Sequence, residues 1–228
     1  MKLLAIETAT EACSAALLVD GEVTERYRVQ PRGHSELILS MVDELLAVAE
    51  LPLSALDAVA FGRGPGSFTG VRIATGVIQG IAFAADLPVA PVSTLAALAQ
   101  RCYREAGEER LLAAYDARMQ EVYWGVYEVG AAGLVNALVP DQVADPGKVS
   151  PPPDDDWCGV GSGWGSYRQQ LEVHLGDRLK RVLPALFCSA HDVALLGAAC
   201  VAANELVSAE MALPVYLRDK VAVKSTKR

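Results

Sequence analysis

The 228-residue chain is predicted to be an α/β protein of two similar lobes, each with a mixed sheet flanked by helices. Two observations predict this fold class. The chain opens with three strand patterns joined by tight turns, and helix and strand patterns alternate after them. The same opening, in which a strand, an acidic turn, a strand, a turn and a strand follow one another, recurs about a hundred residues later. This recurrence indicates an internal duplication.

The first lobe begins with a continuous apolar run at residues 2–6, which is typical of a buried strand and ends at Glu7 and Thr8. Residues 13–19 and 22–29 have strand patterns on either side of Asp-Gly, a dipeptide typical of tight hairpins. Three strands followed by helix, strand, helix and strand is the order of the actin-like, sugar-kinase-like (ASKHA) ATPase lobe. In that fold the first turn faces the nucleotide phosphates.

Residues 35–49 are predicted to form an amphipathic helix. Its apolar stripe recurs at helical spacing and consists of Leu37, Ile38, Met41, Val42, Leu45, Leu46 and Ala49. His34 precedes this helix. A helical metal site would need a second ligand four residues further on, and that position is occupied by Ile38. We therefore predict no metal site here, and a surface or capping role for His34.

A glycine-rich loop at residues 61–72 separates a short apolar strand, residues 58–61, from a helix at residues 71–85. Its glycines and proline require a tight, irregular backbone, and Ser67 or Thr69 can cap the following helix. Such a turn can hold an anion. However, no Gly-Lys-Ser/Thr follows, and the spacing is not a dinucleotide fingerprint. The loop is predicted to be a structural or partner-facing turn rather than a phosphate site.

The helix after this loop carries Gly76, Gly80 and Ala84 at four-residue spacing. Each glycine inside a helix costs about 1 kcal/mol relative to alanine, so two on one face indicate that another backbone comes close. That backbone could belong to the protein's own sheet or to a partner, and the sequence leaves both open.

A polar break at residues 107–109 divides the chain into lobes at residues 1–106 and 107–228. A strand at residues 89–92 and a helix at 93–104 complete the first lobe. The second lobe repeats the opening pattern, with Asp116 and Arg118 in its acidic turn. Its predicted elements are strands at residues 111–115, 121–129 and 134–139, a long loop at 140–156, a strand that leads into a glycine turn at 157–164, helices at 167–175 and 190–203, and a closing segment at 213–218.

Composition limits the function classes. The net charge of −8 and the lack of a basic face argue against a protein that grips nucleic acid by itself. Five scattered cysteines argue against a zinc site or a disulfide framework and are typical of a reducing compartment. The apolar helix after the glycine loop is interrupted by Arg72 and Gln79, which argues against a membrane span. We expect a cytoplasmic protein without a leader segment.

Four stretches of the chain resemble the bacterial TsaB (YeaZ) family, and the resemblance extends over nearly the whole chain. They are residues 5–10 (AIETAT), 64–73 (GPGSFTGVRI), 116–118 (DAR) and 214–218 (PVYLR). The resemblance implies the ASKHA fold. It also implies a role in making threonylcarbamoyladenosine at the adenosine next to the anticodon of tRNAs that read codons beginning with A.

In that family the protein is not the catalyst. The resemblance implies that it pairs with a larger paralogue, TsaD, which holds the metal and transfers the threonylcarbamoyl group, and that a small ATPase, TsaE, joins them. Family members also form homodimers through the helical face that meets TsaD. Contact with tRNA is expected only through the complex. Older labels call such proteins glycoproteases.

The residues agree with a non-catalytic role. The paralogue's metal site uses two histidines four apart, on the helix where this chain has His34 and Ile38. The second lobe, of about 120 residues, is also short for a complete nucleotide cleft. We expect no catalytic residue, no metal and no cofactor beyond weak binding of ATP or ADP. Predicted partner-binding residues are Leu37, Ile38, Met41, Leu45, Arg72, Gly76 and Gly80; predicted nucleotide-facing residues are Glu7, Thr8, Asp116 and Arg118.

Two alternatives remain open. The first is an autonomous ATP-dependent enzyme of the sugar-kinase type, with Glu7 or Asp116 near Mg²⁺, although both acids could simply cap turns. The second is a peptidase, for which the sequence offers no Ser/His/Asp arrangement of recognisable spacing and no pair of metal ligands. The sequence favours the accessory subunit over both.

Overall fold

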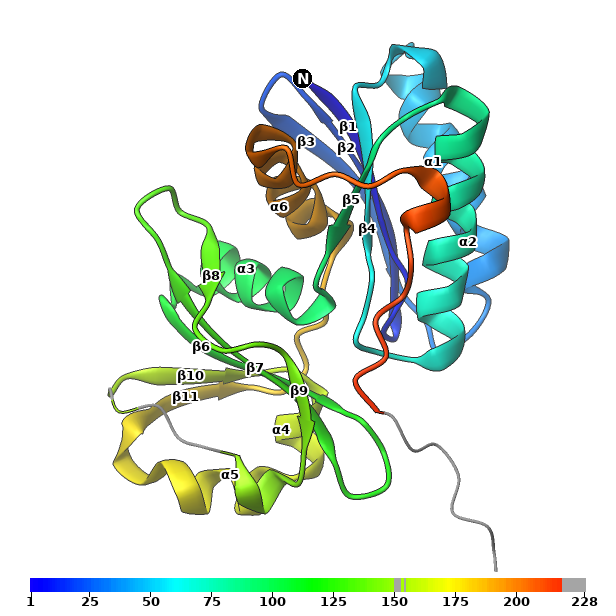
Figure 1. Ribbon diagram of the computed structural model, residues 1–228. Helices are drawn as coiled ribbons and strands as arrows, with labels where there is room; N and C mark the ends of the chain where they lie inside the picture. Colours follow the sequence, from blue (N-terminus) through cyan, green and yellow to red (C-terminus); the bar gives the residue numbers. More distant parts are fainter. Residues whose placement is uncertain (150–152, 154, 219–228) are drawn as a thin grey trace, which may run out of the picture.

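The computed structural model describes residues 1–149, 153 and 155–218, and its strands form two sheets of the same topology (Figure 1). The first sheet has the order β3-β2-β1-β4-β5, and the second has the order β8-β7-β6-β10-β11, with β9 beside β7. In both sheets the central strand, β1 or β6, is antiparallel to the next strand in the chain, β2 or β7, and parallel to its neighbour on the other side, β4 or β10. The strands are β1 (Lys2–Glu7), β2 (Ala12–Val19), β3 (Glu22–Val29), β4 (Ala58–Gly62), β5 (Val89–Val92), β6 (Arg110–Asp116), β7 (Val122–Val129), β8 (Val135–Ala137), β9 (Gln142–Ala144), β10 (Trp157–Val160) and β11 (Leu179–Leu183). The predicted duplication and the actin-like fold class are confirmed.

Six α-helices complete the described part of the chain. They are α1 (His34–Val48), α2 (Phe68–Ala85), α3 (Thr94–Ala106), α4 (Ser162–Ser166), α5 (Arg168–Leu175) and α6 (Ala190–Ala203). Of the two candidate caps for α2, Ser67 is the one used, because its hydroxyl accepts from the Gly70 N–H at 3.4 Å. The helix therefore begins three residues before the predicted start. Ser93 caps α3 in the same way, through the Ala96 N–H.

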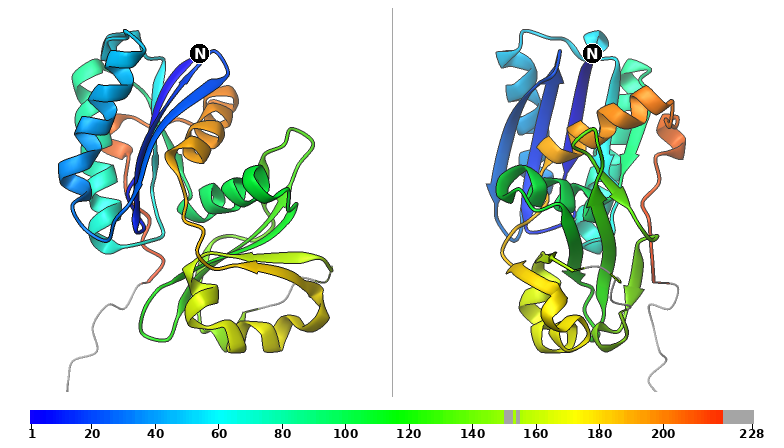
Figure 2. Two further views of the ribbon diagram at one scale, coloured as in Figure 1. Left: turned by 180° about the vertical axis from the view of Figure 1, so that it is seen from behind. Right: turned by 90° about the vertical axis from the view of Figure 1, so that its left-hand side faces the viewer.

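The helices and sheets lie in layers (Figures 1 and 2). Helices α1 and α2 cover the outer face of the first sheet, α6 and α3 lie between the two sheets, and α4 and α5 cover the far face of the second. Along β1, Leu3 and Ala5 belong to the inner core, whereas Leu4 and Ile6 belong to the core under α1 and α2. Since both faces of the strand are buried, its sequence is a continuous apolar run.

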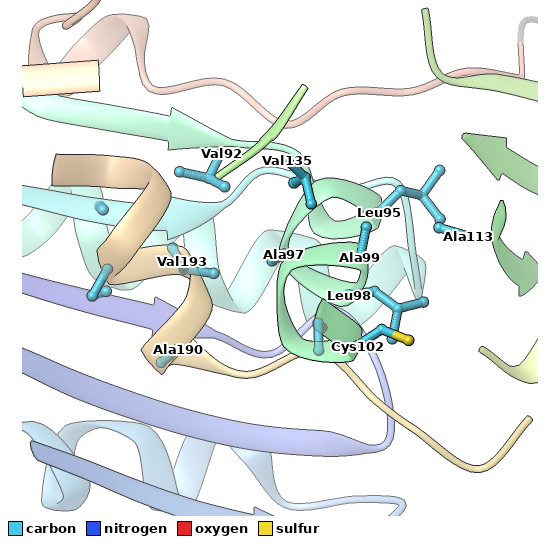
Figure 3. Close-up of a cluster of buried hydrophobic side chains, with 14 of the residues drawn as sticks. Val92, Leu95, Ala97, Leu98, Ala99, Cys102, Ala113, Val135, Ala190 and Val193 are labelled. Carbon is cyan, nitrogen blue, oxygen red and sulfur yellow. The ribbon is translucent and has the colours of Figure 1, made fainter. Parts of the chain in front are cut away.

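The inner core joins the two lobes, and Figure 3 shows part of it. Helix α3 follows the first sheet in the chain but packs against β6, β7 and β8, whereas α6 follows the second sheet but packs against β1, β2, β4 and β5. If the lobes are divided between residues 106 and 107, each of these two helices therefore packs on the sheet of the other lobe. Gly197 of α6 permits the close packing, because a Cβ there would lie 2.7 Å from the Cβ of Ala60.

Several local features differ from the sequence-based expectation. The predicted loop at 140–156 contains β9, which pairs with β7, and its residues 150–152 and 154 lie outside the described part. Strand β11 was not predicted, because its charged residues Lys180 and Arg181 are exposed and its other residues are only half-buried. The closing segment at 213–218 has no regular secondary structure and crosses the surface from α2 to the second lobe.

Helix α2 is long and apolar enough to cross a membrane by length and composition, the single such helix in the described ranges. In the fold it packs against β4, and its inner residues, among them Ala74 and Ile78, are fully buried in the core of the first lobe. Its apolar character follows from this burial, as in the core helices of layered proteins.

Candidate functional site

The glycine-rich loop is held against the β1–β2 turn by direct backbone contact. The Ser67 N–H donates to the Ala9 carbonyl at 2.7 Å, and the Thr8 hydroxyl donates to the Gly70 carbonyl at 2.7 Å. A Cβ at Gly70 would lie 2.1 Å from the Thr8 carbonyl oxygen, and one at Gly66 would lie 2.5 Å from that of Ala9. These glycines are therefore required by the close approach of two backbones.

Glu7 lies at the end of β1 and is fully buried. One carboxyl oxygen accepts from the Ala9 N–H at 2.5 Å, and the other accepts from the Thr94 hydroxyl at 3.0 Å. Burial raises the pKa of Glu7 above its usual value, and the hydrogen bonds from Ala9 and Thr94 oppose this only in part. Glu7 and Thr8 are both enclosed in the protein, so these two predicted nucleotide-facing residues do not reach the cleft described below.

We expect Glu7→Gln to change how stability depends on pH. The folded-state pKa of Glu7 is raised, so its contribution to stability is full below about pH 4.5 and is lost as the pH rises through the folded-state pKa. The neutral glutamine should remove this loss. Urea unfolding of both proteins from pH 4 to pH 8 should show a free-energy difference that moves in favour of the variant as the pH rises; a constant difference would contradict burial as the cause.

A cleft of about 890 Å³ opens between the lobes. The first lobe contributes residues 9–11 and the start of α2, and the second lobe contributes residues 115–119 and part of α4. Residues Val215 to Arg218 line it as well. Two of the predicted nucleotide-facing residues, Asp116 and Arg118, lie in this lining. The cleft therefore brings together residues from the two duplicated turns.

The carboxylate of Asp116 is occupied by donors from its own lobe. It accepts from the Ser166 hydroxyl and the Tyr167 hydroxyl, each at 3.2 Å, and from the Arg118 N–H at 2.8 Å. The Arg118 side chain is 81% exposed and makes a longer contact, 3.4 Å, with the same carboxylate. Within the described ranges, no three His, Cys, Asp or Glu side chains are grouped to hold a metal ion. The Asp116 carboxylate thus joins the turn between β6 and β7 to Ser166 and Tyr167.

His34 was predicted to be a surface or capping residue, but it is buried, and α1 has Gly33 at its N-cap with no side-chain cap hydrogen bond. Its Nδ1 lies 3.2 Å from the Thr8 carbonyl oxygen, and its Nε2 lies 2.9 Å from that of Gln30. The ring thus bridges the β1–β2 turn and the segment before α1. The sequence pattern does not predict these contacts, because both partners are backbone carbonyl oxygens and Thr8 lies 26 residues earlier in the chain.

The predicted partner-binding residues of α1 require a correction. Ile38, Met41 and Leu45 are buried in the core between α1 and the first sheet, and Leu37 is half-buried against it. The apolar stripe of this helix faces the protein's own sheet, so Ile38, Met41 and Leu45 are unavailable to a partner while the chain is folded, and Leu37 is only partly exposed.

The predicted residues of α2 lie at the surface. Arg72, Gly76 and Gly80 are exposed, and a Cβ added at either glycine would meet nothing within 4 Å. The alternative in which these glycines pack on the protein's own sheet is therefore wrong. Phe83, at a further helical step of three, is 83% exposed and was not predicted. Steps of four and three residues place Gly76, Gly80 and Phe83 on one face of the helix, so the spacing alone could have predicted that Phe83 lies on the exposed face.

At its N-terminal end, the surface of α2 continues into the C-terminal segment. The Arg72 guanidinium lies 3.2 Å from the centre of the Phe68 ring and 5.0 Å from that of Tyr216. Phe68 and Tyr216 are themselves in contact, with ring centres 6.2 Å apart, and both are substantially exposed. Such cation–π stacking orders the arginine at the edge of the cleft.

The chain has relatives of known sequence and structure. The family model of TsaD, described as tRNA N6-adenosine threonylcarbamoyltransferase, matches residues 23–225. The tRNA threonylcarbamoyladenosine biosynthesis protein TsaB of Escherichia coli K12 is 42% identical over 98% of this chain and 97% of its own length. The protein of the same name from Haemophilus influenzae is 40% identical over 97% and 95%.

Solved structures agree with this assignment. The structure of YeaZ from Pseudomonas aeruginosa is 50% identical and superimposes with a TM-score of 0.89, covering 95% of this chain and 99% of its own. Another structure from that organism, described as an uncharacterized protein with similarity to peptidase YEAZ, gives the same TM-score at 49% identity. With two duplicated ASKHA-type lobes and this similarity along nearly its whole length, the chain belongs to the TsaB (YeaZ) family.

Proposed function

We propose that the protein is a non-catalytic scaffold subunit in the synthesis of threonylcarbamoyladenosine on tRNA. In this proposal it pairs with a TsaD paralogue, with TsaE joining the pair, and it acts in the cytoplasm on tRNAs that read codons beginning with A. A second copy of the chain is the competing partner for the same surface. Contact with tRNA is made through the complex, since the chain has a net charge of −8.

The observation that carries the proposal is the outer face of α2. Gly76 and Gly80 leave an open strip on which the backbone of another helix could lie, and Phe83 stands exposed beside it. Two glycines on the exposed face of a helix cost about 1 kcal/mol each relative to alanine. A partner that packs against them offsets this cost by burying apolar surface at about 25 cal/mol per Å².

The alternative is an autonomous ATP-dependent phosphotransferase that uses the cleft between the lobes. The volume of the cleft, about 890 Å³, and the presence of Asp116 in its lining favour this candidate. Against it, the Asp116 carboxylate already accepts hydrogen bonds from Arg118, Ser166 and Tyr167 of its own lobe, and Glu7 is enclosed away from the cleft. Neither acid is arranged as a free ligand for the Mg²⁺ that phosphoryl transfer requires.

Light scattering with ATP turnover separates these functions. The purified chain, mixed with TsaD from the same source, should give a heterodimer mass, and ATP hydrolysis should require the other subunits. The chain alone should show no turnover above a buffer control. Robust turnover by the isolated chain would favour the phosphotransferase, and failure to form any complex with TsaD would contradict the scaffold proposal.

A further inference from the structure

The C-terminal segment 212–218, here called the strap, connects the outer helix of the first lobe to the cleft-lining turn of the second. On α2, Gln79 donates to the Ala212 carbonyl at 3.1 Å, and Tyr216 stacks beside Arg72. Midway, the Val215 N–H donates to the Arg63 carbonyl at 2.8 Å. The strap has no regular secondary structure, and these contacts, together with the burial of Ala212 in the first-lobe core, hold its first-lobe end.

At its other end, Arg218 holds the turn between β6 and β7. Its guanidinium donates to the Ala117 carbonyl at 3.0 Å, to the Arg118 carbonyl at 3.3 Å and to the Glu121 carboxylate, where the Nε–Oε2 distance is 3.0 Å. The Arg218 side chain is only 17% exposed. A planar guanidinium can bond several acceptors at once in this way, whereas the single ammonium group of a lysine lacks the fixed fork geometry.

The turn that Arg218 holds is strained. Three consecutive non-glycine residues, Arg118, Met119 and Gln120, have positive φ values of 61°, 55° and 62°. L-residues visit this left-handed region rarely and almost always singly, so a run of three needs support from outside the turn. This conformation turns Arg118 and Met119 toward the cleft, whose wall they form, and both remain exposed.

We propose that the strap couples the partner-facing surface of α2 to the shape of the cleft. The contacts of Arg218 with the turn between β6 and β7 are here called the latch, and the coupling through the strap is called the link. When the latch is engaged, the strained turn is held and the cleft has the shape described above; when it is released, the turn relaxes and the wall of the cleft changes. The link to a partner rests on the proposed function, because it requires a protein that docks on α2 next to Arg72 and Tyr216. The latch itself is a property of the free chain.

Amide hydrogen exchange on the full-length free chain tests the latch. Two amides report on the turn: the Ala117 N–H donates to the Glu121 carbonyl at 3.0 Å, and the Glu121 N–H donates to the Arg118 carbonyl at 3.1 Å. In Arg218→Ala these two amides should exchange at least about tenfold faster, because local opening is no longer opposed by the guanidinium. Arg218→Lys should restore protection only in part.

Two further variants separate the link from a local structural role. Tyr216→Ala does not alter any group bonded to the turn, yet it should also speed exchange at Ala117 and Glu121, because the first-lobe anchor of the strap is weakened. Arg168→Ala removes a surface arginine whose Nε lies 2.6 Å from Glu172 on α5, and should leave both amides unchanged. Unchanged exchange in Arg218→Ala, or a uniform increase across the whole chain, would overturn the latch; no effect of Tyr216→Ala would overturn the link.

A final arm adds TsaD to the wild-type chain. Binding should slow exchange at Ala117 and Glu121, because a partner that presses on Tyr216 and Arg72 holds the strap in place. If TsaD binds and these amides do not respond, the link fails and the scaffold proposal stands. If TsaD does not bind, the scaffold proposal fails, and the latch is still decided by the free-chain variants.

Discussion

Gly70→Ala is expected to lower the free energy of unfolding by about 3 kcal/mol, as overpacking against an immobile group does. The added Cβ would lie 2.1 Å from the Thr8 carbonyl oxygen, which is backbone and cannot rotate away. The start of α2 would have to separate from the β1–β2 turn, which would also break the bond from the Thr8 hydroxyl to the Gly70 carbonyl. Urea unfolding measures the change, and the midpoint of thermal unfolding should fall by about 10 °C.

Gly76→Ala is the matched control, because it makes the same chemical change in the same helix. A Cβ at Gly76 meets nothing within 4 Å, so the isolated protein should be unchanged or more stable by up to about 1 kcal/mol. Equal destabilisation by the two substitutions would show that loss of glycine from α2, and not the close approach to Thr8, is responsible.

Gly80→Arg is expected to weaken association with TsaD, or with a second copy of the chain, by about 100-fold, equivalent to about 2.8 kcal/mol. The long side chain would fill the strip on which the partner backbone is proposed to lie. Since the position is open in the free chain, the variant should fold with an unchanged midpoint of thermal unfolding. Light scattering and titration calorimetry on the mixed proteins measure the loss.

Val173→Arg is the control for Gly80→Arg, because it adds the same large, charged side chain at another exposed position. Val173 is 79% exposed on α5, on the far face of the second lobe, so this substitution should leave association intact. If Gly80→Arg associates as well as the wild type, α2 is not the interface. If Gly80→Arg is unfolded, the glycine serves the fold and not the surface.

The sequence determined the elements that depend on local chemistry. The Asp20–Gly21 turn has positive φ at both residues, as the predicted hairpin requires. Ser67 and Ser93 cap their helices through their own hydroxyls. The recurrence of the strand pattern predicted two sheets of one topology, because strand order follows from short connections between neighbouring strands. Four-residue spacing placed Gly76 and Gly80 on one face of α2.

Only the tertiary structure decided which face of each helix is covered. The apolar stripe of α1 and the glycines of α2 both indicate a contact, and periodicity cannot tell a contact with the protein's own sheet from one with another molecule. The fold buries Ile38 and leaves Gly80 open. Likewise, three features join groups that are far apart in the chain. They are the packing of α3 and α6 on each other's sheets, the burial of Glu7 beside Thr94, and the hydrogen bond from Arg218 to the Ala117 carbonyl. Such pairings are set by packing around a shared core, which no local pattern records.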